Sequence, residues 1–257
     1  MNNYITYNID QSGICFLQIN RPPVNALSYN LLKELRIKLI KLQNENFRIL
    51  IIGTENPHFS AGADLKERKI MSKEESGDAL DNFNDCFNTL DEFSKPVICL
   101  INGFCLGGGA ELAASCDIRI GADDSIIGFP EVSIGIIPGA GGTQRLPRII
   151  GISNAKYWIY TAKKFNAQES YDYGFLNFIT TKDNLNKFSI KLANEIIKNA
   201  PIAVSSAKKA ITKGYNKNIN IGLIEERKAY EISLNTQDRD EALSAFNEKR
   251  LPIWRNK

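Results

Sequence analysis

The sequence has very little histidine. His58 is the single histidine among 257 residues, and it lies in the loop-like stretch 56–60. A histidine-rich metal site is therefore excluded, and a Ser-His-Asp or Cys-His triad would depend on this one side chain. We interpret His58 as a loop residue without a part in proton transfer. If the protein is an acid–base enzyme, carboxylates must carry the chemistry.

The sequence also lacks paired cysteines with metal-ligand spacing. Its cysteines are odd in number, show no CxxC spacing and mostly lie inside apolar runs. They are Cys15, Cys86, Cys99, Cys105 and Cys116. We expect reduced core side chains and no metal site.

Long apolar runs and one-sided charge are missing as well. No run approaches the roughly 18 residues that span a bilayer, and the first residues show no targeting pattern. We therefore expect a soluble protein without a membrane partner, in the cytoplasm by default. Lysine and arginine number 32 against 29 acidic residues and are spread along the chain, so nucleic acid is not expected as a partner. With 43% apolar residues, the chain can bury a sizeable core.

Strand and helix patterns alternate over the first part of the chain. Short apolar runs typical of buried strands occur at 14–19, 49–53, 97–101, 118–120 and 126–129. Ser28 is a plausible N-cap for a helix with leucines at helical spacing, and Phe83, Phe87 and Leu90 mark a second helix. This alternation predicts an α/β fold with much parallel pairing.

Helical patterns dominate after about Gly151. The expected helices lie at 182–199, 202–213, 219–234 and 238–247. No low-complexity linker or repeat of fixed period interrupts the chain. We expect a core at 1–195 that carries the functional site, and a helical region at 196–257.

A glycine turn lies between an apolar strand and a segment of high helix propensity. Gly107, Gly108 and Gly109 are followed by Ala110 and Glu111. Such a turn lets backbone approach a ligand, and the free N–H groups at the helix start can donate to a negatively charged oxygen. A tight packing turn is the alternative. The turn lacks the Lys-Ser/Thr ending of a P-loop and the dinucleotide spacing, so nucleotide hydrolysis and hydride transfer lose support.

A second turn of small residues, 59–66, follows the strand that ends at Gly53 and also opens a helix. If the two turns lie side by side, one amide from each could bind a single carbonyl oxygen. Such a pair would stabilise the enolate that forms when a thioester reacts at its α carbon.

Two acidic residues stand in apolar surroundings. Glu111 lies between Ala110 and Leu112, and Glu131 follows Pro130. Taken alone, Glu111 is typical of a surface residue of a helix, and Glu131 is typical of a solvated acidic residue in a turn. Burial without partners would be costly, which tilts each of them towards function.

Three blocks in order resemble the crotonase superfamily, the enoyl-CoA hydratases and isomerases. They are 61–66 (AGADLK), 107–111 (GGGAE) and 129–146 (FPEVSIGIIPGAGGTQRL). The similarity extends from 20–27 (NRPPVNAL) to 245–250 (AFNEKR) and so covers nearly the whole chain. The resemblance implies a spiral of ββα repeats with a C-terminal helical trimerisation region, as a homotrimer or homohexamer.

The resemblance assigns roles to residues of the three blocks. The backbone N–H groups of Ala63 and Gly108 would form the oxyanion hole, and Glu111 and Glu131 would be the catalytic carboxyls. Glu111 would deprotonate the water and Glu131 would exchange the proton at Cα, although the division between them stays open. The loop 139–145 would shape the acyl pocket.

Coenzyme A is the expected ligand, as part of the substrate, and no further cofactor is implied. The residues that match its binding positions are Val24, Ala26, Ala61, Asp64 and Leu65, with Phe246 and Lys249 offered from a neighbouring subunit. The alternative for these last two is an amphipathic terminal helix with a solvated lysine.

Since many relatives with other reactions replace one of the acids, the presence of both favours an enoyl-CoA hydratase of fatty-acid breakdown, amino-acid breakdown or a related acyl-CoA pathway. Enoyl-CoA isomerisation, or another crotonase-type lyase or dehydratase reaction, is the nearest alternative. A non-catalytic acyl-CoA or RNA-binding scaffold is the second. The charged stretch 66–81 is expected to be a lid or disordered.

Overall fold

The computed structural model describes residues 3–257, which divide into two compact units. One unit comprises the residues up to Phe93 together with Val97–Ile190, and the other comprises Ser94–Pro96 and Lys191–Lys257. None of the helices within 3–257 combines the length and the apolar character that crossing a bilayer requires.

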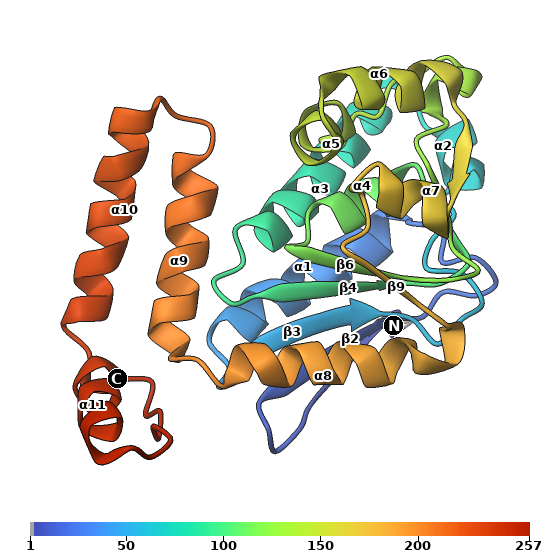
Figure 1. The fold of residues 1–257 in the computed structure, drawn as a ribbon. Helices are drawn as coiled ribbons and strands as arrows, with labels where there is room; N and C mark the ends of the chain where they lie inside the picture. The colour runs from blue at the N-terminus through green and yellow to red at the C-terminus, as the bar shows by residue number, and fades with distance from the viewer. Residues whose placement is uncertain (1–2) are drawn as a thin grey trace. The chain divides into compact units, whose positions relative to one another are not determined.

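A six-stranded sheet forms the centre of the first unit (Figure 1). In spatial order its strands are β1 (Ile5–Ile9), β2 (Ile14–Ile19), β3 (Ile49–Gly53), β4 (Val97–Ile101), β6 (Ile118–Ala122) and β9 (Phe178–Thr180). β1 is antiparallel to β2, and all other neighbours are parallel. β3 and β4 are buried along their whole length, as is typical of parallel strands covered on both faces.

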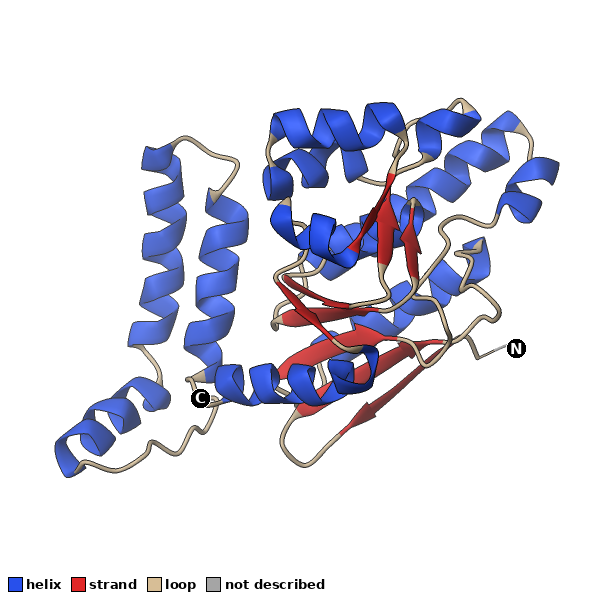
Figure 2. Cartoon of the chain, turned by 45° about the vertical axis from the view of Figure 1, so that its right-hand side comes forward, coloured by secondary structure: helices blue, strands red, loops and turns tan. Residues whose placement is uncertain are grey.

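A smaller sheet runs across the direction of the first (Figure 2). It consists of β5 (Phe104–Leu106), β7 (Ile126–Gly128) and β8 (Lys164–Asn166) in that order. β5 and β7 are parallel, and β7 and β8 are antiparallel. Only two residues separate the end of β4 from the start of β5, so the chain passes directly from one sheet to the other.

Helices cover the sheets of the first unit. They are α1 (Tyr29–Gln43), α2 (Leu65–Ile70), α3 (Lys73–Asp91), α4 (Gly108–Ala114), α5 (Gly142–Ile150), α6 (Ile152–Thr161), α7 (Ala167–Asp172) and the start of α8 (Leu185–Ile197), with 3-10 turns η1 (Glu131–Ile134) and η2 (Lys182–Asn184). Ser28 caps α1 as predicted, because its hydroxyl accepts the Leu31 N–H at 3.3 Å. The five cysteines are free and buried, which confirms the expectation of reduced core side chains.

The stretch 66–81 is helical except at 71–72, which contradicts the expected disorder, whereas a function as a lid stays a prediction. α2 occupies its first part, and Ser72 and Glu75 form a capping box at the start of α3. α2 buries no residue, and the buried face of α3 begins only at Ala79. The charged side chains of this stretch therefore lie on exposed faces of α2 and α3.

The second unit is helical, as predicted. It contains the end of α8, then α9 (Pro201–Gly214), α10 (Ile219–Leu234) and α11 (Gln237–Glu248). α9 and α10 approach closely at Gly214 and Gly222, where a Cβ on Gly214 would lie 3.4 Å from the Gly222 Cα. The C-terminal segment folds back on α11, since the Asp238 carboxylate accepts the Arg255 N–H at 2.6 Å.

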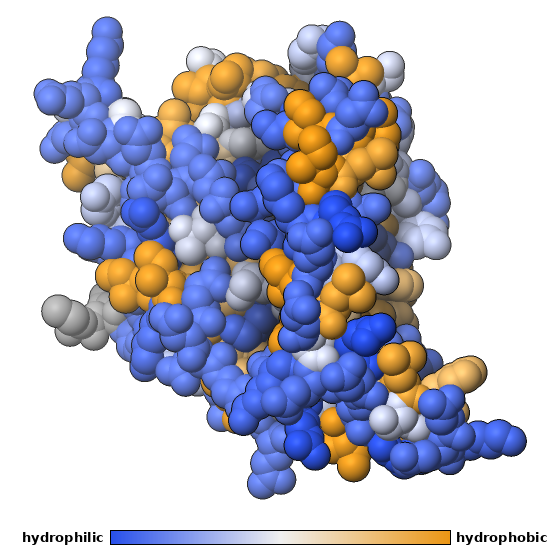
Figure 3. Space-filling view, turned by 90° about the vertical axis from the view of Figure 1, so that its left-hand side faces the viewer, coloured by the Kyte–Doolittle hydropathy of each residue, from blue (hydrophilic) through white to orange (hydrophobic). Residues whose placement is uncertain are grey.

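Large apolar side chains remain exposed on the second unit. The more exposed ones are Ile211, Tyr215, Ile219, Leu223, Ile224, Tyr230, Leu243, Phe246, Leu251 and Ile253. Figure 3 shows a surface that is largely hydrophilic with separate hydrophobic patches. Exposed apolar groups in this number are typical of an interaction surface.

Candidate active site

The two small-residue turns lie side by side, as the sequence predicts. Ser60 and Cys105 form an isolated parallel bridge. The Ser60 N–H donates to the Phe104 carbonyl at 2.9 Å, and the Leu106 N–H donates to the Ser60 carbonyl at 3.0 Å. These hydrogen bonds fix the turn before α2 against the turn before α4.

The backbone at Gly62 and Gly108 is packed too closely for larger residues. A Cβ on Gly62 would lie 2.7 Å from the Leu106 carbonyl oxygen and 3.3 Å from the Gly108 nitrogen. A Cβ on Gly108 would lie 2.9 Å from Phe83 Cε1 and 3.5 Å from the Ala63 nitrogen. The amides of Ala63 and Gly108 are therefore neighbours. Within residues 3–257, neither of these two N–H groups donates a hydrogen bond to another protein group.

Glu111 lies in the first turn of α4, and only 4% of it is exposed. Its Oε1 accepts two backbone hydrogen bonds, from the N–H groups of Ala140 and Gly142, each at 2.8 Å. Burial raises the pKa of this carboxyl to about 6, although the two N–H groups and the positive charge of Arg145 act in the opposite direction. One oxygen is thus anchored, and no protein hydrogen bond is found for Oε2 among the described residues.

The loop that holds Glu111 has a role that the sequence reasoning missed. The resemblance gave 139–145 a part in shaping the acyl pocket, whereas two of its amides anchor a candidate catalytic carboxyl. Gly141 has φ +99°, and a Cβ on Gly142 would lie 2.9 Å from Glu111 Oε1. A glycine pair at the start of α5 was the available indication, because N–H groups at a helix start are free to bind a carboxylate.

Arg145 also holds the loop 139–145 in place. Its guanidinium donates to the Ala140 carbonyl at 3.3 Å and to Asn88 Oδ1 at 2.7 Å, and it pairs with Asp91 at 3.2 Å. The loop that carries the two donors to Glu111 is therefore tied to α3.

Glu131 is the first residue of η1 and is 9% exposed. Its Oε2 is buried without a hydrogen-bond partner within residues 3–257. Burial, and then the negative charge of Glu111, raise the pKa of Glu131 to about 7. A Cβ on Gly107 would lie 2.9 Å from Glu131 Oε1, so this carboxyl lies against the same glycine turn that carries the Gly108 amide. The structure thus brings both glutamates and both amides to one place.

Five candidate ligand residues gather where the stretch 24–27 meets the stretch 61–65. The Ala61 N–H donates to the Val24 carbonyl at 2.9 Å. Arg21 donates to the Ala26 carbonyl at 2.7 Å and forms an ion pair with Asp64 at 2.6 Å. Leu65 is 58% exposed. Val24, Ala26, Ala61, Asp64 and Leu65 therefore lie beside the Ala63 amide, on a partly exposed face.

Phe246 and Lys249 lie in the second unit, whereas all other candidate residues lie in the first. Phe246 is in α11 and is 82% exposed, and Lys249 is the left-handed residue that ends this helix. His58 has a structural contact: its Nδ1 accepts the Phe104 N–H at 3.2 Å, and the two rings stack. Residues 3–257 contain no cluster of three or more metal-binding side chains.

Known proteins resemble this chain over its whole length. The sequence model of the family described as enoyl-CoA hydratase/isomerase matches residues 10–257. A short-chain-enoyl-CoA hydratase of Clostridium acetobutylicum is 38% identical over 254 residues, which cover 97% of this chain and 96% of that protein. An enoyl-CoA isomerase/hydratase of Mycosarcoma maydis is 42% identical over 257 residues, with 96% and 94% covered. The crystal structure of an enoyl-CoA hydratase from Bacillus anthracis matches with a TM-score of 0.96 at 40% identity, covering 99% and 100% of the two chains.

Proposed function

Since the chain belongs to the enoyl-CoA hydratase/isomerase family, we propose that it is an enoyl-CoA hydratase, which adds water reversibly across the 2,3 double bond of 2-enoyl-CoA thioesters. Membership makes it a crotonase-type enzyme, and the expected crotonase fold with a helical C-terminal region is confirmed. One observation carries the proposal. Two buried carboxyls, with pKa values raised to about 6 and about 7, lie at the glycine turn before α4: Glu111 follows it in the first turn of the helix, and Glu131 packs against Gly107. The amides of Ala63 and Gly108, beside them, donate no hydrogen bond to protein groups within residues 3–257.

The two amides would bind the thioester carbonyl oxygen. As the nucleophile adds at Cβ, the π electrons move through Cα to this oxygen, which becomes an enolate. Donors that are already fixed in place stabilise that charge without reorganisation, and each is typically worth roughly 3–4 kcal/mol in the transition state. The N–H groups of Ala63 and Gly108 would meet this requirement, because the backbone hydrogen bonds of Ser60 to Phe104 and Leu106 fix the two turns against each other.

The two carboxyls would divide the proton transfers. Glu111 Oε1 is held by two amides, so its other oxygen is free to take a proton from the water that forms the new O–C bond at Cβ. Glu131, with the higher pKa, would deliver the proton to Cα as the enolate returns its electrons. Exchange with solvent then restores one ionised and one protonated carboxyl. Dehydration is the same sequence in reverse.

The proposed division predicts a bell-shaped pH dependence of kcat/KM for hydration. Activity requires Glu111 ionised and Glu131 protonated, so the rate should rise as pH passes about 6 and fall above about 7. Because the two groups interact, both apparent pKa values belong to the pair. Steady-state kinetics from pH 5 to 9 measure the profile. A rate that is flat across this range would contradict the assignment.

Arg145 offers a prediction on positioning. Arg145→Gln removes a positive charge that lowers the pKa of Glu111 and a donor to the loop, so the acidic limb of the profile should move to higher pH. We expect kcat to fall by about 10-fold, since a displaced carboxyl is a poorer base. Arg148→Gln, on the same helix, is the matched control and should leave the limb in place. If the acidic limb of the pH profile does not shift in Arg145→Gln, Arg145 has no part in lowering the pKa of Glu111.

Assays with purified protein separate hydration from the alternatives. Water addition to crotonyl-CoA removes the conjugated enoyl absorbance, and we expect this loss together with formation of the 3-hydroxyacyl-CoA. An isomerase would leave crotonyl-CoA intact and would move the double bond of a 3-enoyl-CoA. A scaffold would do neither. A panel of enoyl-CoA chain lengths then defines the acyl preference.

We further propose where coenzyme A binds and that several copies of the chain assemble. The coenzyme A moiety would run along Val24, Ala26, Ala61, Asp64 and Leu65, and no cofactor beyond the substrate is required. Phe246 and Lys249 would reach it from a neighbouring subunit of a homotrimer or homohexamer. The exposed apolar side chains of the second unit support assembly. Light scattering coupled to gel filtration tests this, and a monomer would contradict it.

A further inference from the structure

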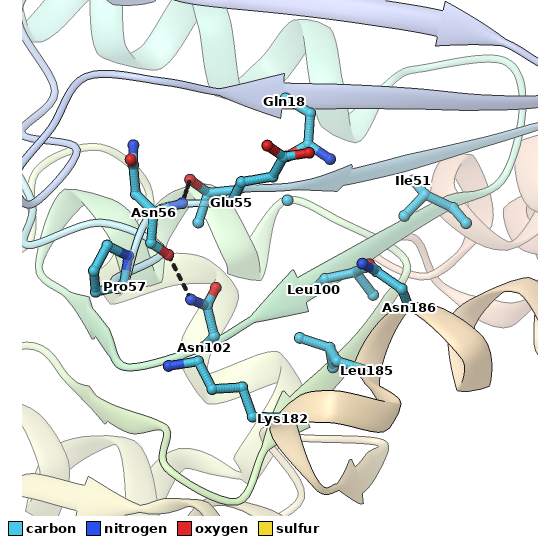
Figure 4. A pocket seen from close by; sticks show the side chains of 12 residues that line it. Gln18, Ile51, Glu55, Asn56, Pro57, Leu100, Asn102, Lys182, Leu185 and Asn186 are labelled. Atoms are coloured by element: carbon cyan, nitrogen blue, oxygen red, sulfur yellow. Dashed lines mark hydrogen bonds between the residues drawn. The ribbon is translucent and has the colours of Figure 1, made fainter.

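A pocket of the first unit has neither of the two glutamates in its lining. Figure 4 shows the side chains that form it. Its volume is about 390 Å³. It is formed at the carboxyl ends of β2, β3 and β4 and at the start of α8. None of the residues given a part in hydration lines it.

The sheet leaves room for this pocket because β3 ends in a glycine. Gln18 pairs in register with Gly53, so both face the same side of the sheet. A Cβ on Gly53 would already lie 3.3 Å from the Leu100 Cβ. Because Gly53 has no side chain, space remains between Gln18 and Leu100, with Ile51 beside it (Figure 4).

Two oxygens of the pocket lack partners. Asn102 Oδ1 and Gln18 Oε1 are buried without a hydrogen bond to any group in the described chain. Asn102 is only 5% exposed, and its Nδ2 donates to the Asn56 carbonyl at 2.7 Å. That bond fixes the side chain, so that Oδ1 faces the pocket (Figure 4). Buried acceptors are costly when left unpaired, so both oxygens favour a ligand with hydrogen-bond donors.

The charge around the pocket favours a cation. The Glu55 carboxylate lies beside Gln18 (Figure 4). Lys182 also lines the pocket, but its charge is compensated by an ion pair with Asp124 at 2.8 Å. The walls contributed by Ile51, Leu100 and Leu185 are apolar.

We propose that this pocket binds a short diamine that is protonated at both ends. One ammonium donates to Gln18 Oε1 and the Glu55 carboxylate, the other donates to Asn102 Oδ1, and the hydrocarbon chain between them packs on the apolar walls. Each ammonium supplies up to three donors, so the acceptors at both ends of the chain can be satisfied. The site is separate from the proposed hydration chemistry and does not depend on it.

Calorimetric titration of the full chain with 1,4-diaminobutane tests the proposal. We expect a dissociation constant on the order of 1 mM, and at least about 10-fold weaker binding of 1,4-butanediol and of butanoate. Absence of diamine binding would assign the pocket to solvent and overturn the proposal. Equal binding of the diol would overturn the part played by charge.

Substitutions locate the binding. Gln18→Leu removes one unpaired acceptor while keeping the bulk of the side chain, so diamine affinity should fall at least about 10-fold with the fold intact. Gln11→Leu, in the exposed β1–β2 turn, is the matched control and should bind as the parent does. Glu55→Gln, at an exposed position, is a second variant that should weaken the diamine and not the diol. Unchanged diamine affinity in both pocket variants would place the binding elsewhere and contradict the proposal.

Discussion

Replacing Glu131 by glutamine should lower kcat for the hydration of crotonyl-CoA by about 10³-fold, because the carboxamide cannot deliver a proton to Cα. Glutamine has nearly the same shape, so KM should change little. Steady-state kinetics at the pH optimum measure the effect. Glu92→Gln, at an exposed position, is the matched control and should keep full activity. A Glu131→Gln enzyme with a kcat near that of the parent would remove Glu131 from the mechanism.

The same substitution should stabilise the fold at neutral pH. The folded pKa of Glu131 is about 7 against an ordinary value of 4.5, so the folded chain retains a proton that the unfolded chain releases. The destabilisation from this carboxyl is absent below pH 4.5 and grows as pH rises to about 7. Glutamine removes it, and we expect a gain on the order of 2–3 kcal/mol at pH 8 and almost none at pH 4. Urea unfolding at both pH values checks this, and equal gains at both would contradict it.

Replacing Glu111 by glutamine is the second large effect. The carboxamide oxygen can still accept the N–H groups of Ala140 and Gly142, so the loop should stay in place. The general base is lost, and kcat should fall by about 10²–10⁴-fold. Enzyme turnover on crotonyl-CoA, with thermal unfolding as a check on folding, measures this.

The double variant distinguishes shared from separate action. If Glu111 and Glu131 act on one water and one enolate, the losses should not multiply, and Glu111→Gln/Glu131→Gln should be about as slow as the poorer single variant. Losses that multiply would indicate independent roles. A double variant that retains most of the activity would favour a different site altogether.

Much of the fold could be predicted from the sequence. Apolar runs marked the strands from Ile14 to Ile101, and Ser28 marked the start of a helix, because these elements depend on local patterns. The adjacency of the two glycine turns was a hypothesis, since a tertiary contact between Ser60 and Cys105 decides it. The resemblance, rather than residue type alone, favoured Glu111 and Glu131 over the solvated alternatives.

Other features depend on contacts that no local pattern records. The amides of Ala140 and Gly142 lie about 30 positions from Glu111 in the chain, so the two hydrogen bonds that hold this carboxyl could not be predicted. The charged stretch 66–81 has few apolar residues, so the main sign of a helix in its sequence is the capping box at Ser72. The pocket at Gly53 arises from strand register, which becomes known only with the sheet order.

A crystal structure with bound acetoacetyl-CoA would show whether the two amides and the two glutamates act on one acyl group. We expect the thioester oxygen within about 2.7–3.1 Å of both the Ala63 and Gly108 nitrogens. We also expect the carboxyls of Glu111 and Glu131 to face C2 and C3 of the acyl group. A thioester oxygen directed away from these amides, or an acyl chain that does not reach the two glutamates, would contradict the proposal.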